Sequence, residues 1–135
     1  MAIRNGGSAS CLALIFDTHV LIWIAYDGSQ IGPAVREAIL STDAPLFVSA
    51  VTAWELTDLA GRGRINPAIN FAAIRDMLSL VVIDLPAELW RLAADLPNIH
   101  GDPVDRMLIA HAIHADLTLV TADRAMQRYP VRTLW

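Results

Sequence analysis

The sequence predicts an α/β fold, a three-layer α/β/α sandwich around a mostly parallel central sheet. Short apolar runs of strand type alternate with amphipathic helical stretches along the chain of 135 residues. The first run, residues 12–16, is apolar at every position, which is typical of a strand buried between two helical layers. Because strands and helices alternate, right-handed βαβ crossovers are expected, and these place the strands parallel.

Turn and cap residues delimit the expected elements. Ser49 and Asn70 are good helix N-caps, and Pro33 stands near a helix start, where its missing N–H costs nothing. Strands are expected at 12–16, 46–48, 80–85, 117–121 and 131–133. Helices are expected at 18–26, 33–42, 50–60, 71–79, 86–96, 102–115 and, as a short helix, 123–128.

The composition indicates one domain with an apolar interior. Residues 1–10 are polar and rich in Gly and Ser, so we expect a flexible N-terminal tail followed by a single domain over 11–135. Hydrophobic residues make up 55% of the chain, yet no apolar run reaches the roughly 17–25 residues of a membrane helix. The single cysteine, Cys11, excludes an internal disulfide and fits a reducing cytoplasm. So apolar a domain is expected to cover part of its surface with a protein partner.

The charges exclude some classes of function. The formal net charge is −4, so no overall basic field indicates a nucleic-acid-binding protein. All 10 basic residues are arginines, so any mechanism that needs a lysine, such as that of a phosphoacceptor receiver domain, is excluded. A phosphatase of the haloacid-dehalogenase type would need an acid two residues after Asp17, where this chain has His19.

Three acids are predicted to meet at one edge of the sheet. Asp17 directly follows the first strand, and Asp123 follows the strand 117–121 by two residues. Glu55 lies in the second turn of the helix capped by Ser49, just after another strand end. The carboxyl ends of parallel strands share one edge, which is where open α/β sheets bind ligands.

Each acid also has a purely structural interpretation. Asp17, taken alone, is as easily explained as the N-cap of the next helix, and Asp123 could cap its own short helix. Asp102 is most simply an N-cap followed by a proline. Asp105 would be favoured by the helix dipole without any chemical role. Glu55, among apolar neighbours, is the hardest to explain in structural terms.

Taken together, the acids favour a metal site. Several carboxylates crowded at one edge repel one another and become protonated unless a cation joins them. Oxygen ligands without a Cys or His cluster suit Mg²⁺, with Mn²⁺ as a possible substitute, rather than zinc. Such ions, one or a pair, activate a water and neutralise charge developing on a phosphodiester.

Four segments resemble the motif blocks of PIN-domain proteins, and more narrowly those of VapC-type toxins of bacterial toxin–antitoxin pairs. They are FDTHVLIW from Phe16, SAVTAWEL from Ser49, DPVDRMLIAHA from Asp102 and VTADR from Val120. They occur in the family's order and span nearly the whole chain. The family's fold is a parallel-sheet α/β/α sandwich, in agreement with the expectation above.

The resemblance implies a metal-dependent endoribonuclease. It implies that Asp17, Glu55 and Asp105 hold Mg²⁺, with Asp123 as a fourth acid and Thr121 as a supporting polar residue. It favours Asp105 over Asp102 as the ligand, a choice that spacing alone leaves open. It further implies an RNA substrate, a cognate antitoxin that plugs the acidic groove, and a homodimer. The alternative is a catalytically weak PIN-like module that acts by binding RNA or a protein.

Other polar and aromatic residues are expected to have supporting or structural roles. Arg62 and Arg64, in a Gly-rich turn, are the better candidates for phosphate contacts, while Arg106 is expected to orient Asp105 or Asp102 through an ion pair. Arg124 directly follows Asp123 and is a further candidate. His19 is expected to be a hydrogen-bonded structural histidine, and His100 carries no signal. Core or interface positions, rather than base-stacking ones, are expected for three tryptophans: Trp23, Trp54 and Trp90.

Overall fold

A computed structural model describes residues 12–135, and the expected tail 1–10 lies outside this range. Five parallel strands form one sheet in the order β3-β2-β1-β4-β5. The strands are β1 (Leu14–Phe16), β2 (Leu46–Ser49), β3 (Val81–Ile83), β4 (Thr118–Val120) and β5 (Thr133–Leu134). The α-helices are α1 (Thr18–Tyr26), α2 (Pro33–Ser41), α3 (Ala50–Gly61), α4 (Phe71–Leu78), α5 (Leu89–Asp95) and α6 (Pro103–His114). Two 3₁₀ helices are η2 (Pro67–Ile69) and η3 (Met126–Arg128).

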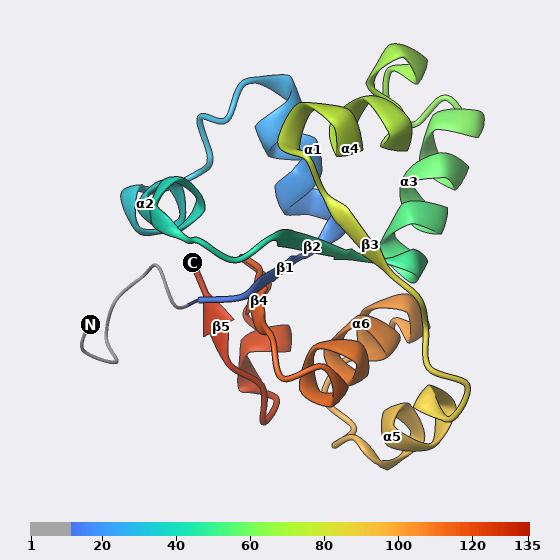
Figure 1. Ribbon diagram of the computed structural model, residues 1–135. Coiled ribbons are helices and arrows are strands. Elements are labelled where there is room, and N and C mark those ends of the chain that lie inside the picture. Colours follow the sequence, from blue (N-terminus) through green and yellow to red (C-terminus); the bar gives the residue numbers. More distant parts are fainter. Residues whose placement is uncertain (1–11) are drawn as a thin grey trace.

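Helices cover both faces of the sheet (Figure 1). On one face, side chains of α1 to α4 pack against Leu14 and Phe16 of β1. On the other face, side chains of α5 and α6 pack against Ile15 of β1 and Leu119 of β4. Alternate residues of β1 therefore enter different cores, because successive side chains of a strand point to opposite faces. The predicted three-layer α/β/α fold is confirmed.

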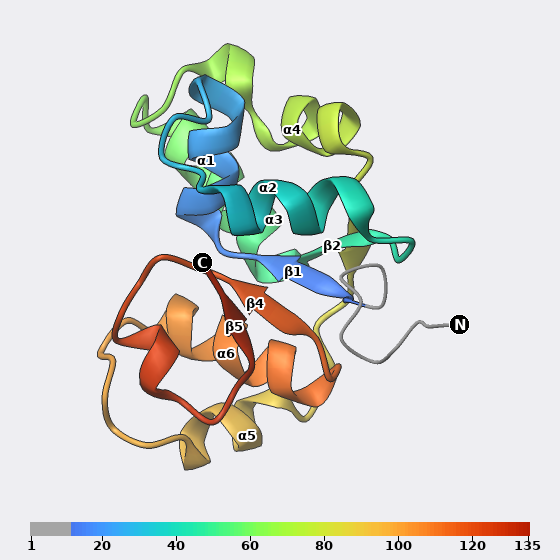
Figure 2. The ribbon, with the colours of Figure 1, turned by 90° about the vertical axis from the view of Figure 1, so that its left-hand side faces the viewer.

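The sheet brings the ends of distant segments together. The Asp17 N–H, at the end of β1, donates to the Val120 carbonyl at the end of β4 over 3.0 Å. The Thr121 N–H donates to the Leu134 carbonyl of β5 over 3.2 Å. Figure 2 shows α1 rising from the end of β1, while β4 and β5 lie side by side below it. Three of the predicted site residues, Asp17, Thr121 and Asp123, lie outside the helices and strands at this edge.

Several predicted boundaries are wrong by a few residues, for identifiable reasons. The helix expected from residue 86 begins only at Leu89, after a turn. The helix expected over 123–128 is reduced to η3, because the Asp123 carboxylate accepts the N–H groups of Ala125 and Met126 and closes a local turn instead. Ser79 is not helical, since it adopts the left-handed conformation that ends α4.

Within residues 12–135, no helix has the length and apolar character needed to cross a bilayer.

Candidate metal-dependent active site

Asp17 lies at the N-cap position of α1, but its side chain does not cap the helix. Its Oδ2 instead accepts a 2.8 Å hydrogen bond from the Thr121 hydroxyl, and only 5% of the residue is exposed. The interpretation of Asp17 as a side-chain cap is therefore wrong. Burial raises the pKa of this carboxyl above its ordinary value, against the opposing effects of the Thr121 bond and of the nearby His19.

The Glu55 side chain, on α3, contacts the first residue of α1, next to Asp17. Ser49 caps α3 by accepting the Val51 N–H over 3.1 Å, as predicted, and Glu55 follows in the second turn. Its Oε1 accepts a hydrogen bond from the hydroxyl of Thr18, which is 2% exposed and next to Asp17. The second carboxylate is therefore held against the start of α1.

Asp102 and Asp105 make different contacts at the start of α6. The Asp102 carboxylate caps α6 by accepting the N–H of Val104 at 2.8 Å and, more weakly, that of Asp105 at 3.4 Å. The side chain of Asp105 is left to the site. Burial, followed by repulsion from Asp17 and Asp102, raises the pKa of the Asp105 carboxyl to about 7. Glu55 adds to this repulsion.

Asp123 both shapes its loop and faces the site. Its Oδ1 accepts the turn N–H groups of Ala125 and Met126, so the expectation that it caps its own segment is confirmed for a turn rather than a helix. Its Oδ2 lies 3.1 Å from Nε2 of His100. Although partial burial raises it, these hydrogen bonds together hold the pKa of the Asp123 carboxyl below its ordinary value.

His100 is the residue that sequence reasoning missed. Its Nε2 lies 3.0 Å from Asp105 Oδ2 and 3.1 Å from Asp123 Oδ2, and its Nδ1 accepts the Asp102 N–H over 3.1 Å. Because Nδ1 is an acceptor, the ring proton of the neutral imidazole is on Nε2. His100 therefore donates to two carboxylates at once and holds α6 against the loop after β4. No spacing pattern could have revealed this, since His100 lies in a loop.

A cavity of about 210 Å³ opens among these side chains. It is lined by Asp17, His19, Trp23, Asp105, Ala122 and Asp123. His19 is exposed and its ring makes no hydrogen bond to another residue of the described range 12–135, so the expectation of a hydrogen-bonded structural histidine is wrong. Trp23 packs against the core as expected, but it also lines this cavity.

The carboxylates fit a divalent cation that prefers oxygen ligands. One candidate group comprises His100, Asp105 and Asp123, whose potential ligand atoms lie within 4.8 Å of one another. Asp17 and Glu55 are outside this compact group, although both repel the charge on Asp105. Such repulsion is relieved either by a proton or by a cation, and carboxylate oxygens suit Mg²⁺ and Mn²⁺.

The arginines do not all occupy their expected places. Arg106 was expected to pair with Asp105 or Asp102, and this is wrong: its guanidinium donates to the carbonyls of Ala93, Leu96 and Pro97 and so binds α6 to α5. Arg62 is exposed and pairs with Asp58 over 3.1 Å. Both Arg62 and Arg64 lie at the end of α3, about two turns beyond Glu55.

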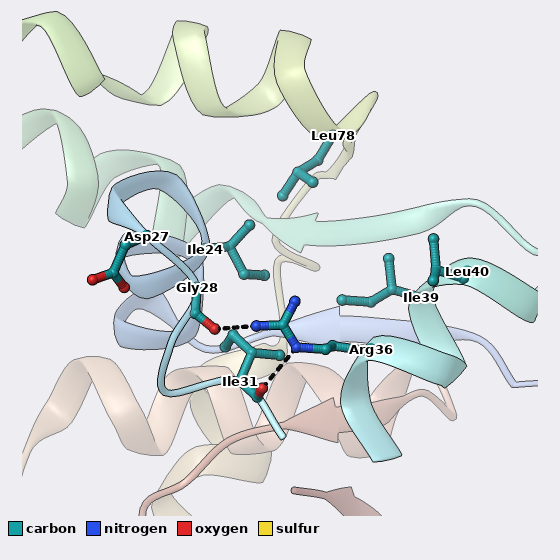
Figure 3. A pocket seen from close by; sticks show the side chains of 8 residues that line it. All are labelled: Ile24, Asp27, Gly28, Ile31, Arg36, Ile39, Leu40 and Leu78. Carbon is teal, nitrogen blue, oxygen red and sulfur yellow. Dashed lines mark hydrogen bonds between the residues drawn. The ribbon is translucent and has the colours of Figure 1, made fainter. Parts of the chain in front are cut away.

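A separate apolar cavity, of about 290 Å³, lies between α1, α2 and α4 (Figure 3). Its lining is mostly apolar and includes Ile24, Ile39, Leu40 and Leu78. The one arginine that reaches it, Arg36, donates to the carbonyls of Gly28 and Ile31, as the dashed lines in Figure 3 mark. None of the clustered acids lies in its lining, so this cavity is separate from the carboxylate cavity.

The model of the PIN domain family matches residues 14–131, which is nearly the whole of the sheet and its helices. The chain belongs to the PIN domain family. It is also 32% identical over 129 residues to Ribonuclease VapC22 of Mycobacterium tuberculosis, an alignment that covers 90% of this chain and 98% of the relative.

Solved structures agree with this PIN fold. The VapBC2 structure from Rickettsia felis, bound to a DNA fragment from its promoter, has a TM-score of 0.71 at 17% identity and covers 91% of this chain and 98% of its own. The DNA-bound VapBC structure from Salmonella typhimurium has a TM-score of 0.69 at 24% identity, with 91% and 97% covered. At these identities the likeness establishes the fold of this PIN domain.

Proposed function

We propose that this PIN domain is a metal-dependent endoribonuclease and the toxin of a toxin–antitoxin pair. The observation that carries the proposal is the gathering of Asp17, Asp105 and Asp123 around one cavity. Glu55 lies close enough to repel the charge on Asp105 and is held by the Thr18 hydroxyl, next to Asp17. The pKa of about 7 for Asp105 reflects burial first and then repulsion from the neighbouring carboxylates, a combination that is frequent at functional sites. The relationship to a protein named a ribonuclease supports the same reaction.

In this proposal Asp17, Glu55, Asp105 and Asp123 hold Mg²⁺, with Mn²⁺ as a substitute. When bound, the ion supplies a water of lowered pKa and neutralises negative charge developing on an RNA phosphodiester. Thr121 fixes the orientation of Asp17, which lines the cavity, by donating a hydrogen bond to its Oδ2. His100 keeps the carboxylates of Asp105 and Asp123 together.

The proposed partners are an RNA substrate, a cognate antitoxin and a second copy of the chain. Exposed apolar side chains support a protein partner, since soluble proteins rarely leave large apolar patches uncovered. Leu40, which lines the cavity of Figure 3, is 86% exposed, and Trp54 is 58% exposed. The proposed place of action is the cytoplasm, where such an RNA substrate is found.

The experiment uses antitoxin-free protein and a mixed pool of cellular RNA. Cleavage is compared in Mg²⁺, Mn²⁺ and EDTA for the wild type, Asp17→Asn and Glu55→Gln. The proposal predicts cleavage only with metal and a loss of at least about 100-fold in either variant, because each removes a charged ligand. Circular dichroism melts confirm that the variants are folded. If the wild type binds RNA but cuts none in metal, the catalytically weak binding module replaces this proposal.

A further inference from the structure

A second hollow continues from the carboxylate cavity toward β5. It has a volume of about 560 Å³ and is lined by Ala122, Arg124, Gln127, Thr133 and Trp135. Ala122 lines both hollows, so they adjoin at the loop after β4. The path from the carboxylates therefore extends along the protein surface beyond the cavity itself.

Two tryptophan rings connect the two hollows. Trp23 lines the carboxylate cavity and Trp135 lines the second hollow, and their ring centroids are 5.6 Å apart at an interplanar angle of 55°. The His19 ring also lies near Trp23, with ring centroids 6.3 Å apart. Trp135 is 41% exposed, which is a large apolar area to leave open beside a charged site.

Most of the other residues that line the second hollow are polar, and one of them, Arg124, is positively charged. Arg124 is exposed, and within residues 12–135 it forms no ion pair. Gln127 is fixed by a 2.9 Å hydrogen bond from its amide to the Thr121 carbonyl, so this part of the lining is held to the backbone that directly follows β4. An exposed guanidinium beside an aromatic ring is the combination that binds a phosphate and a neighbouring base.

We propose that this hollow binds a nucleotide of single-stranded RNA adjacent to the bond that is cut, with its base stacked on Trp135 and its phosphate at Arg124. The proposal deepens the ribonuclease function and rests on it. A base can reach an aromatic ring only when it is unstacked from its neighbours, so the hollow selects unpaired loops over duplex RNA. Since every base has a π-face, the ring tolerates any base at this position.

Binding is measured in Asp105→Asn protein, so that no cleavage occurs, by fluorescence anisotropy of a short labelled single-stranded RNA. Trp135→Leu, which keeps an apolar contact for Trp23, is expected to weaken binding by about 5- to 150-fold. Arg124→Gln is expected to lower the slope of log affinity against log salt by about 0.7, the value for one phosphate of a single strand. Trp90→Leu on α5 and Arg75→Gln on α4, both exposed and on other elements, are the matched controls.

A second test combines changes in the RNA with the change of Trp135. RNAs that carry a single abasic site at successive positions are compared in proteins with Trp135 or with Leu at this position. At one position the abasic site should weaken binding to the Trp135 protein and leave binding to the Trp135→Leu protein unaffected. The inference is overturned if no position shows this coupling. It is also overturned if the Trp135→Leu protein binds RNA as tightly as the Trp90→Leu control, or if neither of these two proteins binds RNA. Metal-dependent cleavage by the wild type would still support the ribonuclease, whereas its absence would remove the ribonuclease proposal itself.

Discussion

Thr121 and Asp17, 104 residues apart in the chain, are joined by a buried 2.8 Å hydrogen bond from the hydroxyl to the carboxylate. Thr121 is fully buried and also accepts the Asp123 N–H over 3.1 Å. One hydroxyl therefore sets the orientation of one acid and the backbone position of another. It does so because β1 and β4 are neighbours in the sheet and end at the same edge.

Thr121→Val should weaken metal binding without unfolding the protein, because it keeps the side-chain shape and removes the hydroxyl. Hydrogen bonds that orient metal ligands typically contribute 10- to 100-fold to affinity, so we expect a decrease in Mn²⁺ affinity of about that size. Isothermal titration calorimetry measures it, with Thr121→Ser as the control that keeps the donor. Equal affinities of the valine variant and the wild type would contradict this role.

The stability of metal-free protein should depend on pH through Asp105. The pKa of this carboxyl is raised from 3.8 to about 7 in the folded protein, so between these values the folded state keeps a proton that the unfolded chain has released. The stabilisation that this proton gives is complete below pH 3.8 and is lost as the pH rises through about 7. In EDTA, Asp105→Asn should therefore gain roughly 2–4 kcal/mol relative to the wild type over this interval.

Urea unfolding at a series of pH values measures that difference. Added Mn²⁺ should reverse it at pH 7, since the wild type then gains binding free energy that the variant lacks. A difference between the two proteins that stays constant from pH 4 to pH 7 in EDTA would show that Asp105 titrates normally in the folded state.

His100→Ala should enlarge the stabilisation by metal. The His100 imidazole donates to the carboxylates of Asp105 and Asp123, and its proton lies where a cation would have to approach both. Without the ring, the metal-free protein loses the His100 N–H that offsets the repulsion between these two carboxylates. The rise in Tm on adding Mn²⁺ should therefore be larger than in the wild type. The reverse result, a smaller rise in Tm than in the wild type, would mean that the ring is a metal ligand instead.

Arg106→Gln should lower the stability of the protein rather than its rate of RNA cleavage. Its guanidinium donates to the carbonyls of Ala93, Leu96 and Pro97, three acceptors that would lose a charged donor. We expect a decrease of about 1.5–3 kcal/mol in the free energy of unfolding. The control is Arg62→Gln, an exposed residue paired only with Asp58, for which the change should stay below about 1 kcal/mol. Similar values for both variants would contradict the assignment.

The fold could be predicted because its causes are local. Apolar runs fix the strands, and caps such as Ser49 and Asn70 fix the helix starts. The site was harder to predict, because its geometry depends on loops. Nothing near His100 in the sequence indicates that its loop closes on Asp123, and Arg106 has acids nearby in sequence but donates to the carbonyls of the preceding segment. The position of Trp135 beside Trp23 depends on the placement of β5.

The most direct test of the metal centre measures metal affinity and RNA cleavage in the same preparations. Asp17→Asn, Glu55→Gln, Asp105→Asn and Asp123→Asn are compared with the wild type for Mn²⁺ affinity by calorimetry and for the cleavage rate of one RNA. The four-carboxylate account predicts that both quantities fall together in each folded variant. A variant that loses Mn²⁺ binding but cleaves RNA at the wild-type rate would contradict it.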